Sequence, residues 1–264
     1  MIFDCITFFR ENFIANLRFE ILKNCVDYFV VCESLYDHRG KKKKLNFRLK
    51  NLKIKNKLIY IILDKPFQSS DPWKRQAIQR EFIFTGLKNA NENDYIMFSD
   101  PDEIPNPDVL KDLNLSKKYG IFLQKHFVYK LNIYNPYSTP WEGTRVCKLK
   151  NLKSIDFMRQ KVLKKNIRKW WRPDKEKNIQ LIENGGWHFN NLFSAKELSL
   201  KLRTFAHTEF SSKKFSDIRL IKKKIKLKTD LFGRNEFYNK VDLDNSFPDY
   251  ILKNKLRLKK YIDI

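Results

Sequence analysis

The first hundred residues constrain the fold of this chain more than any other part of its sequence. Short runs rich in β-branched and aromatic residues alternate there with segments whose apolar residues recur at helical spacing. In chain order, these segments are 1–9 (strand), 12–25 (helix), 28–32 (strand), 58–63 (strand), 73–89 (helix) and 95–98 (strand). Strands that alternate with helices form a mostly parallel sheet flanked by helices. The pattern therefore predicts an α/β fold.

The second half of the chain is less regular. Residues 120–133 are strand-like, 135–143 contain Pro and Gly and are expected to form a loop, and 159–180 are basic and expected to be a mobile loop or a helix. Helical patterns become frequent again from Ala195 onward. Because there is no repeat and no Gly/Ser-rich linker, we expect one domain over residues 1–264 with a helix-rich C-terminal part.

The formal net charge of +24 is compatible with several kinds of anionic partner. The basic runs are scattered along the chain, and Lys greatly outnumbers Arg, a composition that an AT-rich genome also produces. A solvated basic surface and an electrostatic role therefore stand as equal alternatives. For an electrostatic role, peripheral contact with an anionic membrane is as good an explanation as nucleic acid, and we expect no nucleic-acid partner.

No stretch of the sequence approaches the ~20 apolar residues that a membrane-spanning helix needs. The N-terminal apolar run lacks a preceding basic region, so it is typical of a strand and not of a signal peptide. We therefore expect a cytoplasmic location, with attachment to the inner membrane face as an alternative. The four cysteines form no close metal-binding pair, and we expect them to be free thiols.

An acidic run, Asp100-Pro101-Asp102-Glu103, follows directly after the strand expected at 95–98. Ligands of parallel α/β sheets bind beyond the carboxyl ends of the strands, where this run lies. Carboxylates suit hard divalent ions such as Mn²⁺ and Mg²⁺, and such an ion stabilises the charge that develops on a departing diphosphate. An Asp-x-Asp pair alone occurs often by chance, so its position after an apolar strand carries the prediction.

Several separate blocks of the sequence share the order and approximate spacing of one enzyme family. The blocks are Ile2 to Cys5 with Phe8, Phe9 and Glu11; Leu17, Arg18 and Leu22; Val26 to Ser34; Gly40 and Lys41; Arg75, Arg80 and Glu81; Phe98 to Pro105; Gly185 to Phe189; and Ala206 to Phe210. On these blocks the chain resembles glycosyltransferase family 17, the family of the enzyme that adds bisecting GlcNAc to glycoproteins. The resemblance implies a GT-A-type, Rossmann-like fold, a nucleotide-sugar donor such as UDP-GlcNAc, and inversion at the anomeric carbon.

The resemblance also implies that the two halves of the chain bind different substrates. Residues 1–115 would bind the nucleotide sugar, and residues 116–264 would bind the acceptor and supply the C-terminal helices. Because the sequence begins almost at its first strand, we expect a surface glycan or a lipid-linked saccharide as acceptor. Two alternatives use the same residues: a basic nucleic-acid-binding protein or metal-dependent nuclease, and a sugar-binding relative without catalytic activity.

For the acidic run, we expect Asp102 to bind the metal and Asp100 to hold the ribose or a metal-bound water. Glu103 would assist either residue at the donor, or cap the helix that follows. The alternative for the whole run is a surface turn with helix-capping acids.

Three further residues are expected at the donor. Glu33 ends the second strand and could accept hydrogen bonds from the nucleoside, although a structural salt bridge is nearly as good an interpretation. Arg75 and Arg80 lie on the helix before the acidic run, where one guanidinium could bind a phosphate. An exposed helix face is an equal alternative for both arginines.

The Gly185-Gly186-Trp187-His188 turn is the second candidate site. Paired glycines allow a close approach of backbone to a ligand, Trp187 offers a flat face to a base or sugar, and His188 could bind the metal or the diphosphate. A buried structural histidine is the alternative for His188. His207 is a weaker candidate for a phosphate contact.

An inverting transfer needs a base that takes the proton of the acceptor hydroxyl. Glu183, two residues before the paired glycines, is the first candidate for this role. Glu142, in Trp141-Glu142-Gly143, is the second.

Overall fold

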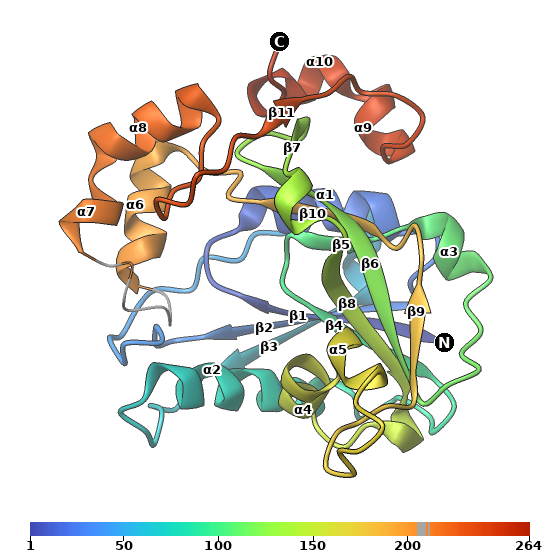
Figure 1. Cartoon of the computed structure of the whole chain (residues 1–264). Coiled ribbons are helices and arrows are strands. Elements are labelled where there is room, and N and C mark those ends of the chain that lie inside the picture. Colours follow the sequence, from blue (N-terminus) through green and yellow to red (C-terminus); the bar gives the residue numbers. More distant parts are fainter. Residues whose placement is uncertain (205–209, 211) are drawn as a thin grey trace.

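A central mixed sheet with helices on both sides forms the body of the molecule (Figure 1). The computed structural model describes residues 1–204, 210 and 212–264. The strand order along the main path is β11-β7-β6-β8-β4-β1-β2-β3. The strands of the first half are β1 (Ile2–Phe8), β2 (Tyr28–Ser34), β3 (Leu58–Leu63), β4 (Tyr95–Ser99) and β5 (Glu103–Pro105). Neighbours among β4, β1, β2 and β3 pair in parallel, which confirms the predicted α/β sheet.

The second half extends this sheet with strands of both directions. They are β6 (Tyr119–Val128), β7 (Ile133–Tyr134), β8 (Trp141–Lys148), β9 (Ile179–Ile182), β10 (Gly186–Asn190) and β11 (Asn239–Lys240). β8 runs antiparallel to both β4 and β6, whereas β9 and β10 pair with β6 in parallel. β8 begins at Trp141, inside the segment predicted to be a loop, because its first residues pair with the long strand β6.

Helices form in the segments predicted at 12–25 and 73–89 and from Ala195 onward, and further short helices lie between residues 107 and 167. They are α1 (Asn12–Leu22), α2 (Pro72–Glu81), α3 (Pro107–Lys111), α4 (Ile155–Lys161), α5 (Lys164–Ile167), α6 (Ala195–Thr204), α7 (Lys213–Ser216), α8 (Ile218–Leu227), α9 (Asp249–Lys253) and α10 (Lys255–Leu258). α2 starts with Pro72 after Asp71, whose side chain accepts a hydrogen bond from the N–H of Trp73. The helix predicted to reach residue 89 ends at Glu81 and continues as a 3₁₀ turn.

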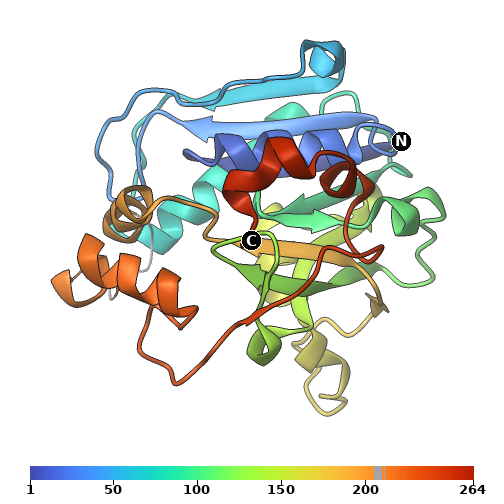
Figure 2. The same cartoon turned by 90° about the horizontal axis from the view of Figure 1, so that it is seen from above.

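Two apolar clusters pack on opposite faces of the sheet. α1 buries Leu17, Phe19 and Leu22 on one face, and α9 and α10 cover the outside of α1 (Figure 2). α4 buries Ile155 and Met158 on the other face. α6, α7 and α8 form a separate helical group beside the carboxyl end of the parallel strands (Figure 1). The helix-rich C-terminal part is thus confirmed.

The structure bears on two exclusions made from the sequence. Cys5, Cys32 and Cys147 are buried free thiols and Cys25 is a half-buried one, as predicted. Burial raises the pKa of Cys25 to about 11, which leaves little reactive thiolate at neutral pH. None of the helices in the described part of the chain is both long and apolar enough to cross a membrane.

Candidate active site

The acidic run joins β4 to β5 and is fixed from below by a buried ion pair. Arg18 of α1 is fully buried and binds the carboxylate of Asp4 at 2.5 Å, as expected of a structural pair. The same guanidinium donates to the carbonyl of Glu103 at 2.6 Å and to the hydroxyl of Ser99 at 2.7 Å. Both ends of the Asp100–Asp102 loop are therefore held by one side chain.

Glu103 organises the site from inside the protein. Its carboxylate is fully buried and accepts hydrogen bonds from the indole of Trp141 at 2.8 Å and from the guanidinium of Arg159 at 2.7 and 2.9 Å. It neither lines a cavity nor caps a helix, because Glu103 begins strand β5. The prediction that Glu103 contacts the donor does not agree with this position.

Arg159, from α4, also binds Asp100, with its Nη2 at 2.8 Å from Oδ2. Burial alone would raise the pKa of Asp100, but Arg159 and Arg80 hold it below its usual range. The sequence did not identify Arg159, which borders the basic segment 159–180. Asp100 and Arg159 both line a cavity, which is described below as the larger of two.

Asp102 faces His188, with Oδ1 at 3.5 Å from Nε2, so two residues that were each predicted as metal ligands lie together. Burial would raise the pKa of Asp102, but the interaction with His188 holds it below its usual range. His188 stacks on His126, with ring centroids 4.5 Å apart, and packs against Trp141 at 4.6 Å. Burial lowers the pKa of His126 to about 2, so this second histidine is neutral at physiological pH.

The fit of these residues to a divalent metal can be judged from their donor atoms. Within the residues that the structure describes, no three His, Cys, Asp or Glu side chains form a ready metal cage. Among the described residues, His188 is the one side chain that contacts the carboxylate of Asp102, and Nδ1 of His188 is buried with no hydrogen-bond partner among them. This donor set fits Mn²⁺ or Mg²⁺ in the manner in which one or two protein ligands are completed by substrate phosphates and water.

The larger cavity has a volume of about 640 Å³, a size typical of small-molecule sites. It opens at the carboxyl ends of β1, β2 and β4, where α/β sheets bind ligands. The first half contributes Phe9, His38 and Arg80 to its lining, and the second half contributes His126 and Trp141. Both predicted halves of the chain therefore line this cavity.

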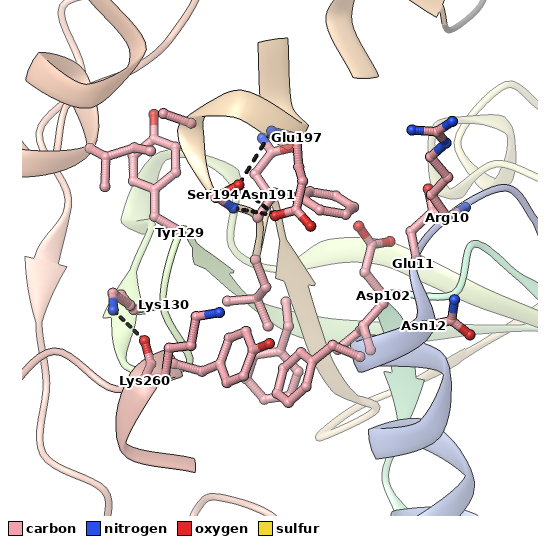
Figure 3. A pocket seen from close by; sticks show the side chains of 18 of the residues that line it. Arg10, Glu11, Asn12, Asp102, Tyr129, Lys130, Asn191, Ser194, Glu197 and Lys260 are labelled. Carbon is pink, nitrogen blue, oxygen red and sulfur yellow. Dashed lines mark hydrogen bonds between the residues drawn. The ribbon is translucent and has the colours of Figure 1, made fainter. Parts of the chain in front are cut away.

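A second cavity of about 610 Å³ meets the first at the acidic run. Figure 3 looks into it, with Glu11 and Asp102 on one side and Lys130 and Lys260 on the opposite side. Both cavities are lined by Asp102 and Glu11, so a ligand in either cavity reaches the same two carboxylates. Glu11 was part of a matched sequence block but had been given no role.

Two of the predicted donor contacts are engaged within the protein. Glu33 is fully buried, binds Lys43 at 2.6 Å and accepts a hydrogen bond from Tyr60 at 2.9 Å, so the salt-bridge alternative describes it. Arg75 donates to the carbonyls of Ser69 at 2.6 Å and His38 at 3.1 Å. Neither residue lines a cavity, because each ties a loop to the body of the fold.

Arg80 does line the larger cavity. Its guanidinium binds Asp156 at 2.8 Å, while its Nε is buried and has no hydrogen-bond partner in the part of the chain that the structure describes. It is therefore the arginine of the pair that a donor phosphate could reach.

Trp187 packs in the core and donates its indole N–H to the carbonyl of Ser246 at 2.9 Å. Alternate residues of a strand face opposite sides, so Trp187 points away from the cavities when His188 points toward them. The paired glycines allow strand β10 to approach its neighbours closely. Gly186 has φ of 122°, and a Cβ there would lie 2.2 Å from the carbonyl oxygen of Ile104. The close approach is thus to β5 and not to a ligand, and Trp141 is one of the aromatic residues that line the larger cavity.

Both candidates for the catalytic base lie outside the two cavities. Glu183 is exposed in the turn between β9 and β10. Glu142 accepts a hydrogen bond from the N–H of Lys164 at 2.9 Å and lies 3.5 Å from Arg145. Glu11 is instead the carboxylate beside Asp102. His207, the weaker candidate, lies outside the described residues.

The sequence was also compared with the profiles of known protein families. The profile of glycosyltransferase family 17 matches residues 1–243. The chain belongs to glycosyltransferase family 17. Asp100, Asp102, His188 and the whole of the parallel sheet lie inside the matched range.

Two curated relatives are enzymes named β-1,4-mannosyl-glycoprotein 4-β-N-acetylglucosaminyltransferase. The rat protein (Rattus norvegicus) is 32% identical over 125 residues, 43% of this chain and 23% of the relative. The human protein (Homo sapiens) is 33% identical over 117 residues, 40% of this chain and 22% of the relative. The aligned region thus spans less than a quarter of either relative.

Among solved structures, a glycosyltransferase involved in the glycosylation of the major capsid of PBCV-1 is similar at a TM-score of 0.33. It is 10% identical, and the superposition covers 69% of this chain and 81% of that chain. The strand order of the chain itself is what defines its fold.

Proposed function

We propose that this chain is an inverting, metal-dependent glycosyltransferase that moves GlcNAc from a UDP-linked donor to a glycan or glycoconjugate. One observation carries the proposal: Asp102 lines two separate cavities of similar size, at the carboxyl end of β4. A transfer reaction needs two substrates that meet at one centre. The family and the names of the two relatives support this choice over a nuclease or a sugar-binding protein without activity.

In this proposal the donor occupies the larger cavity. A divalent cation, when bound, would supply positive charge at the diphosphate, and Asp102 with His188 would hold it there. Arg80 would contribute further positive charge, because it lines the same cavity with an unpaired Nε. Arg159 and Glu103 would keep the loop in place, since both are engaged in buried ion pairs.

A thermal-shift screen of nucleotide sugars, with and without Mn²⁺, tests the proposal. At 100 times its dissociation constant, a bound donor stabilises the native state by about 2.7 kcal/mol, or roughly 5–10 °C for a chain of this length. We expect the largest shift with UDP-GlcNAc plus Mn²⁺ and a smaller one after chelation. The absence of a shift with every nucleotide sugar in the presence of Mn²⁺ would contradict the proposal.

We also propose peripheral contact with an anionic membrane, on the evidence of one exposed segment. Trp170 and Trp171 are 81% and 59% exposed in the loop between α5 and β9. They follow the basic pair Arg168-Lys169, of which Arg168 is exposed and Lys169 is half-buried. Tryptophan favours the membrane–water interface, and basic residues are attracted to anionic headgroups.

A further inference from the structure

The smaller cavity has a rim of unpaired cationic side chains. The five that line it are Arg10, Lys130, Lys222, Lys226 and Lys260. Within the described part of the chain, none of these five forms an ion pair with a carboxylate; Lys130 donates to the carbonyl of Lys260 at 2.5 Å. Lys222 and Lys226 are one helical turn apart on α8, and both are exposed.

Three carboxylates also line this cavity. Glu197 interacts electrostatically with Lys260, but among the described residues none of the three forms an ion pair with the five cations. Asp102 and Glu11 lie where the two cavities meet. Glu197 accepts hydrogen bonds from the hydroxyl of Ser194 at 2.6 Å and from its N–H at 2.9 Å. The cations at the opposite side of the cavity are therefore available to an anion from outside (Figure 3).

The floor of the cavity is apolar and aromatic. Phe13 and Tyr261 stack with ring centroids 3.4 Å apart, and Phe189 and Leu192 continue this surface. Flat apolar faces of this kind suit the C–H face of a sugar ring. The combination of an aromatic floor with a cationic rim fits a ligand that is both a saccharide and an anion.

We infer that the smaller cavity is the acceptor site and that the acceptor is an anionic saccharide, which carries a phosphate or a carboxylate. This inference rests on the function proposed above. A ligand whose anionic group lies at Lys222 and Lys226 extends toward Asp102 and Glu11, since all four residues line one cavity. Lysine ammonium groups bind phosphate and carboxylate oxygens as compact point charges.

In this arrangement Glu11 is the catalytic base. Its Oε2 accepts hydrogen bonds from the N–H groups of Arg10 at 2.8 Å and Phe9 at 3.1 Å, and Oε1 has no partner among the described residues. The acceptor oxygen bonds to the anomeric carbon while the bond from that carbon to the diphosphate oxygen breaks. The electron pair of the broken bond leaves with the diphosphate, and the hydroxyl proton moves to Glu11.

Binding of three small probes tests the inference: glucose 6-phosphate, glucuronate and neutral glucose, each titrated into the full chain by calorimetry. The test variant is Lys222→Gln/Lys226→Gln. The matched control is Arg219→Gln/Lys223→Gln, which removes the same charge at the same spacing from exposed positions of α8 that do not line the cavity. UDP plus Mn²⁺ is titrated into all three proteins as a separate measure of the donor site.

We expect at least one anionic probe to bind about tenfold more tightly than glucose, and the test variant to lose this preference while the control keeps it. UDP binding should be the same in all three proteins. The inference is wrong if neither anionic probe binds better than glucose, if both variants weaken binding equally, or if the test variant weakens UDP binding. A wild-type chain that fails to bind UDP but shows the anion preference would refute the proposed donor site alone.

Discussion

The two cavities that meet at Asp102 have similar volumes, about 640 and 610 Å³, but they differ in how their cationic side chains are used. Four of the five Lys and Arg residues that line the larger cavity form ion pairs with carboxylates of the protein; these are Lys43, Arg80, Arg159 and Arg234. None of the five at the smaller cavity does so within the described residues.

The difference separates two uses of positive charge that the net charge of +24 combines. An ion pair buried in a site fixes neighbouring backbone, and losing one partner leaves the other charge unsatisfied. A cation at a cavity rim that forms no ion pair with a carboxylate of the described residues can bind an anionic ligand. Each of the following predictions tests this division or the centre that the two cavities share.

The largest effect is expected at the shared centre. Asp102→Asn should reduce sugar transfer at least about 100-fold, because in the proposed function this carboxylate holds the cation that offsets the charge on the leaving diphosphate. The thermal midpoint should change little. Rates of transfer with UDP-GlcNAc, alongside the exposed variant Asp242→Asn, measure the effect. Equal rates in the two variants would exclude Asp102 from the reaction.

Stability should distinguish the two kinds of cation. Arg159→Met leaves the carboxylate of Glu103 buried without its charged partner, so we expect a loss of about 3–5 kcal/mol in the free energy of unfolding. Lys226→Met should change this free energy by no more than about 0.5 kcal/mol. Urea denaturation of both variants provides the comparison, and similar losses in the two would remove the distinction.

Glu11→Gln should lower kcat by about 100-fold, because the amide cannot take the acceptor proton. The affinity for UDP should be unchanged. Glu183→Gln is the natural control, since that residue is exposed and lines neither cavity. If instead Glu183→Gln reduced kcat and Glu11→Gln did not, the base would be Glu183, as the sequence had predicted.

The smallest effect concerns the exposed tryptophans. Trp170→Ala/Trp171→Ala should weaken binding to phosphatidylserine vesicles by about tenfold, and salt should release the wild-type chain because exposed charges are screened. Cosedimentation with anionic and neutral vesicles measures this. Equal binding of the wild-type chain to both vesicle types would contradict the membrane proposal and favour a solvated basic surface without an electrostatic role.

Much of the framework was predictable from the sequence because it depends on local patterns. The period of the apolar residues placed β1 to β4, and the end of β4 placed Asp100 and Asp102 at the ligand-binding edge. Asp102 and His188 were each candidate metal ligands on the residues of two matched blocks, and the structure adds that they face each other.

The orientation of single side chains was not predictable in the same way. Strand alternation requires Trp187 and His188 to face opposite sides, but it does not say which of them faces the site. Glu33 and Glu103 are buried because Lys43 and Arg159 reach them from other elements, and no local pattern gives such partners. Glu183 was favoured for its position beside the glycines, which serve strand pairing.

The two residues that the sequence left without a role illustrate the same limit. Arg159 lies on α4, and the one local signal of that helix is the side chain of Ser154, which accepts a hydrogen bond from the N–H of Phe157. Glu11 follows β1 and Asp102 follows β4, and both line the same cavities because these two strands pair in parallel.

Calorimetric titration of UDP into the wild-type chain and into Asp102→Asn tests the central claim most directly. The claim is that Asp102 holds a divalent cation against the donor diphosphate. We predict that Mn²⁺ raises the affinity of the wild-type chain for UDP at least about tenfold over its affinity in EDTA, and that Asp102→Asn abolishes this gain. An affinity for UDP that is the same with Mn²⁺ and with EDTA, or a gain that survives in Asp102→Asn, would contradict it.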